Sequence, residues 1–419
     1  MHSTTIPVGR RAFGLAVVGV LALSACGSDD TAGFDVSGGG DGSDGGGASD
    51  GGGASDGGGA SDGGGGEIPA NLPRLDPGFT AEGFTKDVTA TATIQPTNRT
   101  VITPTGTLTI AGLQEIATVP AEALELDAER GEDGEDLDFA AADGEVLRAL
   151  DLSFAPFGEE SWGSEDSLPV TDLSLSAAGS QTHLAEIARA YEERFLLSVP
   201  EDGSGLLVVS CEGHDQVVDL FTGEREEDEV AAGYYRSNRI QEPHHTFPVS
   251  VKPYPVLYDG KEDSEIVPEV SFQATTLTLT AWTKEKGWAE AGRAWLVLDW
   301  ISESSLANEL SGLVDVGEYV AVATVEVDGE KTTDKITLDK VHNAPSTSTE
   351  ESSLIVPVAV DMSAATISMS GSLSLSLNGG GDFYEIDGSG DREFSSEPLT
   401  VEFSDAEGTA DPQPSDGGS

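Results

Sequence analysis

The sequence contains 419 residues, of which 75 are acidic and 21 are basic, and its formal net charge is −54. A surface this negative repels phosphate backbones, which argues strongly against a nucleic-acid partner, and it attracts cations. We interpret the acidity mainly as a source of solubility.

The first 25 residues have the organisation of an export signal. Arg10-Arg11 gives a basic start, and the uncharged apolar run that follows is shorter than the ~20 residues of a membrane-spanning helix. The next residues, Leu23-Ser24-Ala25-Cys26, resemble the lipobox of bacterial lipoproteins. The resemblance implies cleavage after a signal peptide at 1–25 and a diacylglyceryl thioether on Cys26. The alternative is an ordinary secreted protein with a cysteine at its cleavage site.

Residues 26–66 are almost entirely Gly, Ser, Asp and Ala. We expect a disordered, lipid-anchored tether with an end-to-end distance of ~35 Å. Two or more acyl chains give stable attachment, so the predicted location is extracytoplasmic, on the cell membrane. If the cell is Gram-positive, this is the outer leaflet of the plasma membrane, but the envelope type is left open.

A first domain is expected at 67–225, with alternating apolar residues that predict short strands. Residues 123–138 form an acidic insert that we interpret as a solvated loop. The residues His183–Arg194 have apolar side chains at helical spacing, with Thr182 as a possible N-cap, so they predict one short helix. Cys211 lies in an apolar strand-like run, which favours a buried, unreactive thiol.

A second strand-rich domain is expected at 226–404, after the charged run Glu224–Glu229. The last residues, 405–419, are rich in Pro, Gly and Asp, which predicts a disordered acidic tail.

The two domains contain an internal repeat. Ala141–Leu152 aligns with Ala289–Trp300 at an offset of 148 residues, and each copy has a Gly turn followed by a strand of alternating apolar residues that closes on an Asp. A Thr-Leu-Thr strand precedes each copy, at Thr107–Ile110 and at Thr276–Leu279. A weaker match relates the later strands that begin at Phe195 and Leu354.

This pattern resembles the immunoglobulin-like modules of unknown function in lipoproteins of Gram-positive bacteria, although the cysteine pair of antibody domains is missing. The predicted fold is therefore mainly β, with two tandem immunoglobulin-like β-sandwich domains.

Few residues suggest chemistry. Asp151 and Asp299 are equivalent in the repeat, and we interpret each as a strand-exit residue with a local backbone bond rather than as a functional carboxylate. The tryptophans are expected to pack in the core or at its edges, and a platform for a sugar or peptide is the alternative. The candidates for that platform are Trp282, Trp288, Trp295 and Trp300.

The segment 387–393 places oxygen ligands at alternate positions, as a Ca²⁺ loop does, but it lacks the Gly at the sixth position and the distal Glu. Its candidate ligands are Asp387, Ser389, Asp391 and Glu393. The pair His244-His245 is a weaker metal candidate, and a polar loop is the simpler interpretation of both segments.

The sequence contains no zinc-protease, P-loop, dinucleotide-binding or CxxC motif, so we expect no enzyme and no cofactor. The function predicted is a surface lipoprotein that binds a protein or glycan partner or serves a structural role. The alternative is the solute-binding lipoprotein of a transporter, which is usually rich in helices, or an envelope hydrolase.

Overall fold

The structure is a computed structural model that describes residues 71–83, 88–124, 137–157, 169–307, 314–341, 348–377, 384–388 and 390–403. The expected signal peptide, tether and acidic tail lie outside these residues. Strands make up 66% of the described chain and helical turns 3%, which confirms the mainly β prediction. In the described part no helix is long and apolar enough to cross a membrane.

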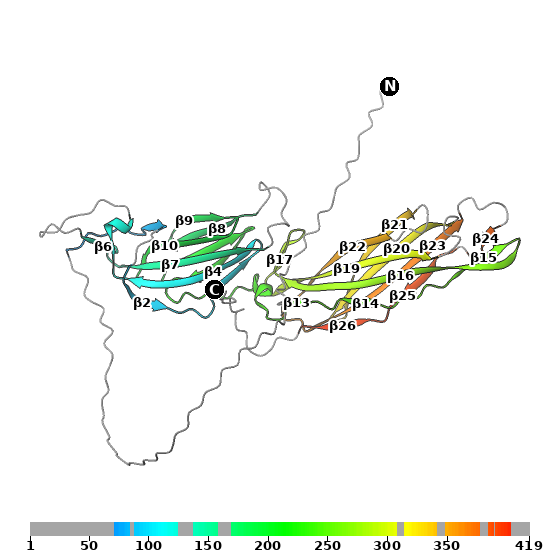
Figure 1. The fold of residues 1–419 in the computed structure, drawn as a ribbon. Helices are drawn as coiled ribbons and strands as arrows, with labels where there is room; N and C mark the ends of the chain where they lie inside the picture. The colour runs from blue at the N-terminus through cyan, green and yellow to red at the C-terminus, as the bar shows by residue number, and fades with distance from the viewer. Residues whose placement is uncertain are drawn as a thin grey trace, which may run out of the picture.

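Residues 71–225, which we call the first half, form two antiparallel sheets that pack face to face (Figure 1). The first sheet has the order β1-β10-β7-β4-β2, with β3 also paired to β4, and the second has the order β12-β11-β8-β9. The strands of the first sheet are β1 (Thr80–Glu82), β2 (Ala90–Ile94), β3 (Thr100–Thr103), β4 (Gly106–Ile116), β7 (Glu145–Pro156) and β10 (Tyr191–Pro200). Those of the second are β8 (Thr171–Ala177), β9 (Ser180–Ile187), β11 (Leu206–Cys211) and β12 (His214–Asp219).

The core of the first half lies between these sheets. Strand β7 alternates, so that Leu150, Leu152 and Phe154 face inward, as their spacing predicts. They meet Leu173 of β8 and Val209 of β11 from the opposite sheet. A short hairpin of β5 (Thr118–Pro120) and β6 (Asp138–Ala140), with the 3-10 turn η1 (Ala121–Leu124), contributes to a second apolar cluster that includes residues of β7 and β10.

Residues 226–403, the second half, repeat this sandwich. One sheet has the order β22-β19-β16-β15-β24, with β13 and β14 also paired to β16, and the other has the order β21-β20-β23-β25, with β26 paired to β23. The strands of the first of these sheets are β13 (Ile240–Gln241), β14 (His245–Phe247), β15 (Tyr254–Tyr258), β16 (Lys261–Thr280), β19 (Arg293–Ala307), β22 (Ser348–Ala359) and β24 (Tyr384–Ile386). Those of the other are β20 (Val314–Val327), β21 (Glu330–Val341), β23 (Ala364–Leu377), β25 (Arg392–Ser395) and β26 (Leu399–Glu402).

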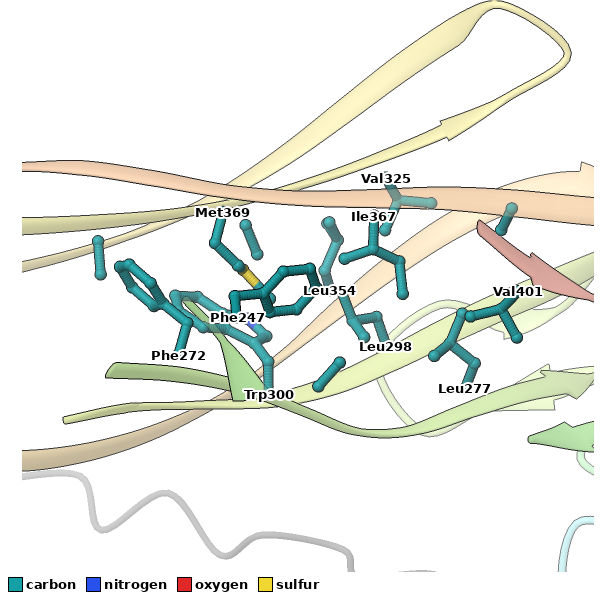
Figure 2. Close-up of a cluster of buried hydrophobic side chains, with 14 of the residues drawn as sticks. Phe247, Phe272, Leu277, Leu298, Trp300, Val325, Leu354, Ile367, Met369 and Val401 are labelled. Atoms are coloured by element: carbon teal, nitrogen blue, oxygen red, sulfur yellow. The ribbon is translucent and has the colours of Figure 1, made fainter. Parts of the chain in front are cut away.

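The second core is built around aromatic rings. Figure 2 shows Phe247, Phe272 and Trp300 lying together between the two sheets, and each is at most 1% exposed. The hydroxyl of Tyr319 on β20 is hydrogen-bonded to that of Ser302 on β19 at 2.6 Å, so these two buried hydroxyls pair across the sheets.

The predicted helix at His183–Arg194 is wrong, because these residues form β9 and the start of β10. Leu173 of β8 lies opposite Ala185, but Ser174 lies opposite His183, so Leu184 is an extra residue in β9. This β-bulge interrupts the two-residue alternation and leaves apolar side chains at a spacing that resembles a helix. Pairing with β8 and β7 overrides the local pattern.

The internal repeat is present in the strand register. Asp151 lies between Arg194 of β10 and Gly112 of β4, and Asp299 lies between Ser353 of β22 and Thr276 of β16. At this point a bulge occurs in the strand beside each of them, in β4 beside β7 and in β16 beside β19.

The weaker of the sequence matches is also in register, since Phe195 lies opposite Leu150 and Leu354 lies opposite Leu298. The match of Thr107–Ile110 to Thr276–Leu279 is wrong by five residues. Ile110 lies opposite Leu152, and Ala274 lies opposite Trp300, so the counterpart of Ile110 is Ala274. The reason is that the Thr-Leu-Thr pattern occurs on both sides of the bulge in a different phase.

The two halves also share their connections. In each, a pair of neighbouring strands in one sheet (β4 and β7; β16 and β19) is followed by a hairpin in the other (β8 and β9; β20 and β21). The next strand (β10; β22) pairs with the second strand of that first pair, and the strand after it (β11; β23) lies in the other sheet. Between the first two strands, the hairpin of β17 (Trp282–Thr283) and β18 (Gly287–Trp288) stands where β5 and β6 stand in the first half.

Candidate functional site

The best-defined cluster of aromatic and polar side chains lies where the two halves meet, and we call it the junction. Figure 1 shows the hairpin with β17 between the two sandwiches. Ile102 of the first half packs with Tyr234 and Ala281 of the second, and Trp282 and Trp288 pack against the same cluster. The junction consists of Ile102, Cys211, His214, Gln216, Arg225, Asp228, Ala231, Tyr234, Tyr235, Ala281, Trp282 and Trp288.

Trp288 connects the halves through both its ring and its N–H group. Its indole Nε1 donates a hydrogen bond to the backbone carbonyl of Cys211 at 3.1 Å. The ring centroid lies 4.8 Å from that of His214 and 5.8 Å from that of Tyr234, the latter edge-on. One side chain of the second half therefore contacts β11 and β12 of the first half directly.

Tyr235 adds a polar network to this contact. Its hydroxyl donates to Oε1 of Gln216 at 2.5 Å and accepts from the backbone N–H of Ile102 at 2.9 Å. Gln216 in turn donates to the carbonyl of Ile102 at 2.8 Å. The guanidinium of Arg225 lies 3.3 Å from the centre of the Tyr235 ring and donates to the carbonyl of Thr100.

A hydrogen bond between side chains closes the junction on another side. Nε2 of His214 lies 2.6 Å from Oδ2 of Asp228, with both side chains less than a quarter exposed. The other carboxylate oxygen, Oδ1, accepts from the backbone N–H groups of Val230 and Ala231. Asp228 therefore fixes the start of the segment that carries Tyr234 and contacts the first half.

Cys211 lies next to this network, and its burial confirms the prediction from the sequence. Desolvation raises the pKa of its thiol, although the hydroxyls of Thr171 and Thr105 partly offset this effect. Since the thiolate is the nucleophilic form, a thiol held in this way is suited to packing.

The tryptophan candidates do not form one open platform. Trp282 and Trp288 lie opposite each other in the β17–β18 hairpin. Trp295 donates its indole N–H to the carbonyl of Gly287, and Trp300 is 1% exposed in the second core. These contacts match the packing interpretation, and they leave no shared face on which a ligand could stack against all four rings.

The equivalent aspartates lie in the middle of their strands rather than at strand exits. Asp299 accepts hydrogen bonds from the hydroxyls of Thr276 and Ser353 at 2.6 and 2.5 Å. Asp151 instead forms an ion pair of 2.8 Å with Arg194. Asp299 therefore bonds side chains of both neighbouring strands, whereas Asp151 bonds a side chain of one neighbouring strand. Each aspartate lies opposite a bulge.

The metal candidates remain separate on the surface. Asp387, Asp391 and Glu393 are exposed, and Ser389 lies outside the described residues. His244 lies 3.7 Å from Glu242, while the His245 ring packs edge-on against Phe247. The described part of the chain contains no group of three or more His, Cys, Asp or Glu side chains arranged to hold a metal ion.

Sequence reasoning missed His214, Gln216, Arg225, Asp228, Tyr234 and Tyr235. The one sequence signal for them is the apolar and aromatic segment directly after the Glu224–Glu229 run, and the run itself predicts only a domain boundary. Comparison with known protein families and with curated proteins gave no match. The fold and the junction of the described residues define a mainly β protein built from two repeated sandwiches in contact.

Proposed function

We propose that this protein is a non-catalytic lipoprotein of the cell exterior that binds a protein or glycan partner through the end of its second half. The sequence supports the anchor, because the Leu23–Cys26 lipobox directly follows a short apolar run. The tandem, immunoglobulin-like sandwiches then serve as a spacer of fixed geometry between the lipid and the partner.

The direction of the chain supports this arrangement. Leu75 donates its backbone N–H to Ala140 of β6, so the chain enters at the end of the first half that is remote from the junction. Strand β16 runs from Lys261 at the outer end of the second half to Thr280 at the junction. The first described residues therefore lie at one end of the tandem and β15 at the other (Figure 1).

The observation that carries the binding proposal is an exposed tyrosine that packs against a half-buried one at this outer end. The described chain has three exposed large hydrophobic residues, and two of them, Tyr258 and Val267, lie on the β15–β16 hairpin. The ring of Tyr258 is 46% exposed and lies 5.0 Å from that of Tyr384 on β24. Tyrosine is enriched at recognition surfaces because its ring buries a large area while its hydroxyl stays solvated.

The hairpin is also an addition to the repeated unit. The counterpart of Gly106, where β4 begins, is Val270, so residues 261–269 of β16 have no equivalent in the first half. An extension that is present in only one copy, and that exposes aromatic surface, is a better candidate for recognition than the shared sandwich.

Two measurements test the two parts of the proposal. Mass spectrometry of the chain isolated from membranes should find acylated Cys26 as the first residue, and Cys26→Ser should move the protein to the soluble fraction. An unmodified Cys26 thiol in the membrane-bound product overturns the anchor.

The second measurement is chemical crosslinking on intact cells. The yield of crosslinked partner should fall at least about tenfold for Tyr258→Ser. The matched control is Val170→Ser, which removes an exposed hydrophobic residue of the first half. Equal yields from both variants overturn the assignment of the binding end.

A further inference from the structure

The edge of the second half's first sheet differs from its counterpart in one specific way. Among the described strands, β22 pairs with β19 alone, so its other edge is the end of the sheet. In the first half the equivalent strand, β10, has its outer edge covered by β1. Exposed edges of this kind can accept a further strand from another chain.

The hydrogen bonds that hold β1 show which positions matter. Ser198 of β10 donates its backbone N–H to the carbonyl of Phe79 at 2.8 Å, and the N–H of Gly83 donates to the carbonyl of Arg194 at 3.0 Å. The side chain of Glu145 binds the same segment, because it accepts from the N–H of Gly78 and from the hydroxyl of Ser198.

The strand register identifies the equivalent positions in the second half. Ser198 lies opposite Leu147, and Pro357 lies opposite Trp295, which is the repeat counterpart of Leu147. Pro357 therefore stands where Ser198 stands, and it has no N–H to donate. Glu145 and Arg293 are likewise equivalent, since they lie opposite Pro200 and Ala359.

Arg293 competes for the remaining bonding group at this position, the carbonyl of Pro357. Its Nη2 donates to the carbonyl of Pro357 at 3.2 Å. A carboxylate that recruits a strand in the first half is thus replaced by a guanidinium that occupies the edge itself. Proline within an edge strand prevents the regular pairing that a further strand needs.

We infer that Pro357 and Arg293 close the β22 edge against the β1 segment of a second copy of this chain. Every copy carries a segment that binds the equivalent edge of its own first half, so an open β22 edge would invite exchange between copies. The closure keeps β1 with β10 and keeps the protein monomeric.

The test converts the second edge into the first. In the full chain carrying Cys26→Ser, the double variant Pro357→Ser/Arg293→Glu should bind a labelled peptide of residues 76–84 at least tenfold more tightly than the parent, by fluorescence anisotropy. Sedimentation velocity should show concentration-dependent dimers of the variant alone. Arg293→Glu by itself is the matched charge control, because it retains the proline and should stay monomeric.

Peptide binding by the parent chain, or a double variant that neither binds peptide nor dimerises, overturns the inference. A reciprocal variant avoids dependence on the folding of the second half. Ser198→Pro should speed hydrogen exchange at Gly83 by at least tenfold, because β1 loses its donor on β10. Unchanged exchange at Gly83 also counts against the inference.

Discussion

Replacing Trp288 by alanine should loosen the junction without removing a core residue of either sandwich. The side chain is half-buried, and its partners are the Cys211 carbonyl and the His214 ring in the first half and the Tyr234 ring in the second. The substitution removes all three contacts, and it leaves the Cys211 carbonyl without its indole donor.

The expected magnitude follows from these contacts. A net hydrogen bond contributes about 1 kcal/mol and an aromatic pair about 0.5–1.5 kcal/mol. Because Trp288 is partly exposed, the full cost of about 3–5 kcal/mol for a core tryptophan does not apply. We expect the opening of the junction to become easier by about 2 kcal/mol, which corresponds to about a 30-fold larger open population.

The thiol of Cys211 reports this opening. The chain has two cysteines, so Cys26→Ser leaves Cys211 as the one thiol. Its reaction with an aromatic disulfide reagent should be about 30-fold faster in Trp288→Ala, since modification of a buried group follows the open population. Trp295→Ala is the control, because that indole bonds Gly287 within the second half. A rate within threefold of the parent, or an equal increase in the control, would refute the assignment of Trp288 to the junction.

Three further variants test the remaining contacts. Tyr235→Phe removes a hydroxyl with two partners and should lower the free energy of unfolding by about 1–3 kcal/mol in urea titrations, since both partners stay buried; a loss below 0.5 kcal/mol would contradict this network. Asp299→Ala should lower the free energy of unfolding by about 1–2 kcal/mol, independently of salt. Asp151→Ala should lower it by under about 1 kcal/mol, and by less in 1 M salt, because the ion pair of Asp151 is partly exposed. A larger loss for Asp151→Ala than for Asp299→Ala would be evidence against the register-based comparison. Burial raises the pKa of Tyr319 to about 12. The pKa in the folded state is above that in the unfolded chain, so the contribution of Tyr319 to the free energy of unfolding is complete below pH 10 and is lost as pH rises toward 12. Tyr319→Phe should therefore reduce the fall of this free energy at alkaline pH by up to about 1.4 kcal/mol per pH unit. An unchanged slope would exclude this tyrosine as the source of the fall.

The strands were predictable wherever alternation was unbroken. Spacing alone predicts the inward face of β7, which carries Leu150, Leu152 and Phe154. The 148-residue repeat correctly aligns Asp151 with Asp299. The errors occur at bulges. The extra residue Leu184 gives β9 an apolar spacing that resembles a helix. The bulge opposite Asp299 shifts the apparent sequence match between β4 and β16. A bulge is defined by the partner strand, so local periodicity carries no record of it.

The junction was hidden for a related reason. Arg225 belongs to a run of charges that is typical of a solvated segment, yet it is 9% exposed because its guanidinium stacks on Tyr235. That partner follows ten residues later, and the groups completing the network come from the first half. Comparison of the repeats makes the arrangement understandable. Trp282 and Trp288 stand where Thr118 and Ala140 stand in the first half, and Ala140 is paired there with the entering chain. The same hairpin end thus receives the chain in one copy and contacts a neighbouring sandwich in the other, and the exchange of small side chains for tryptophan is what this second task requires.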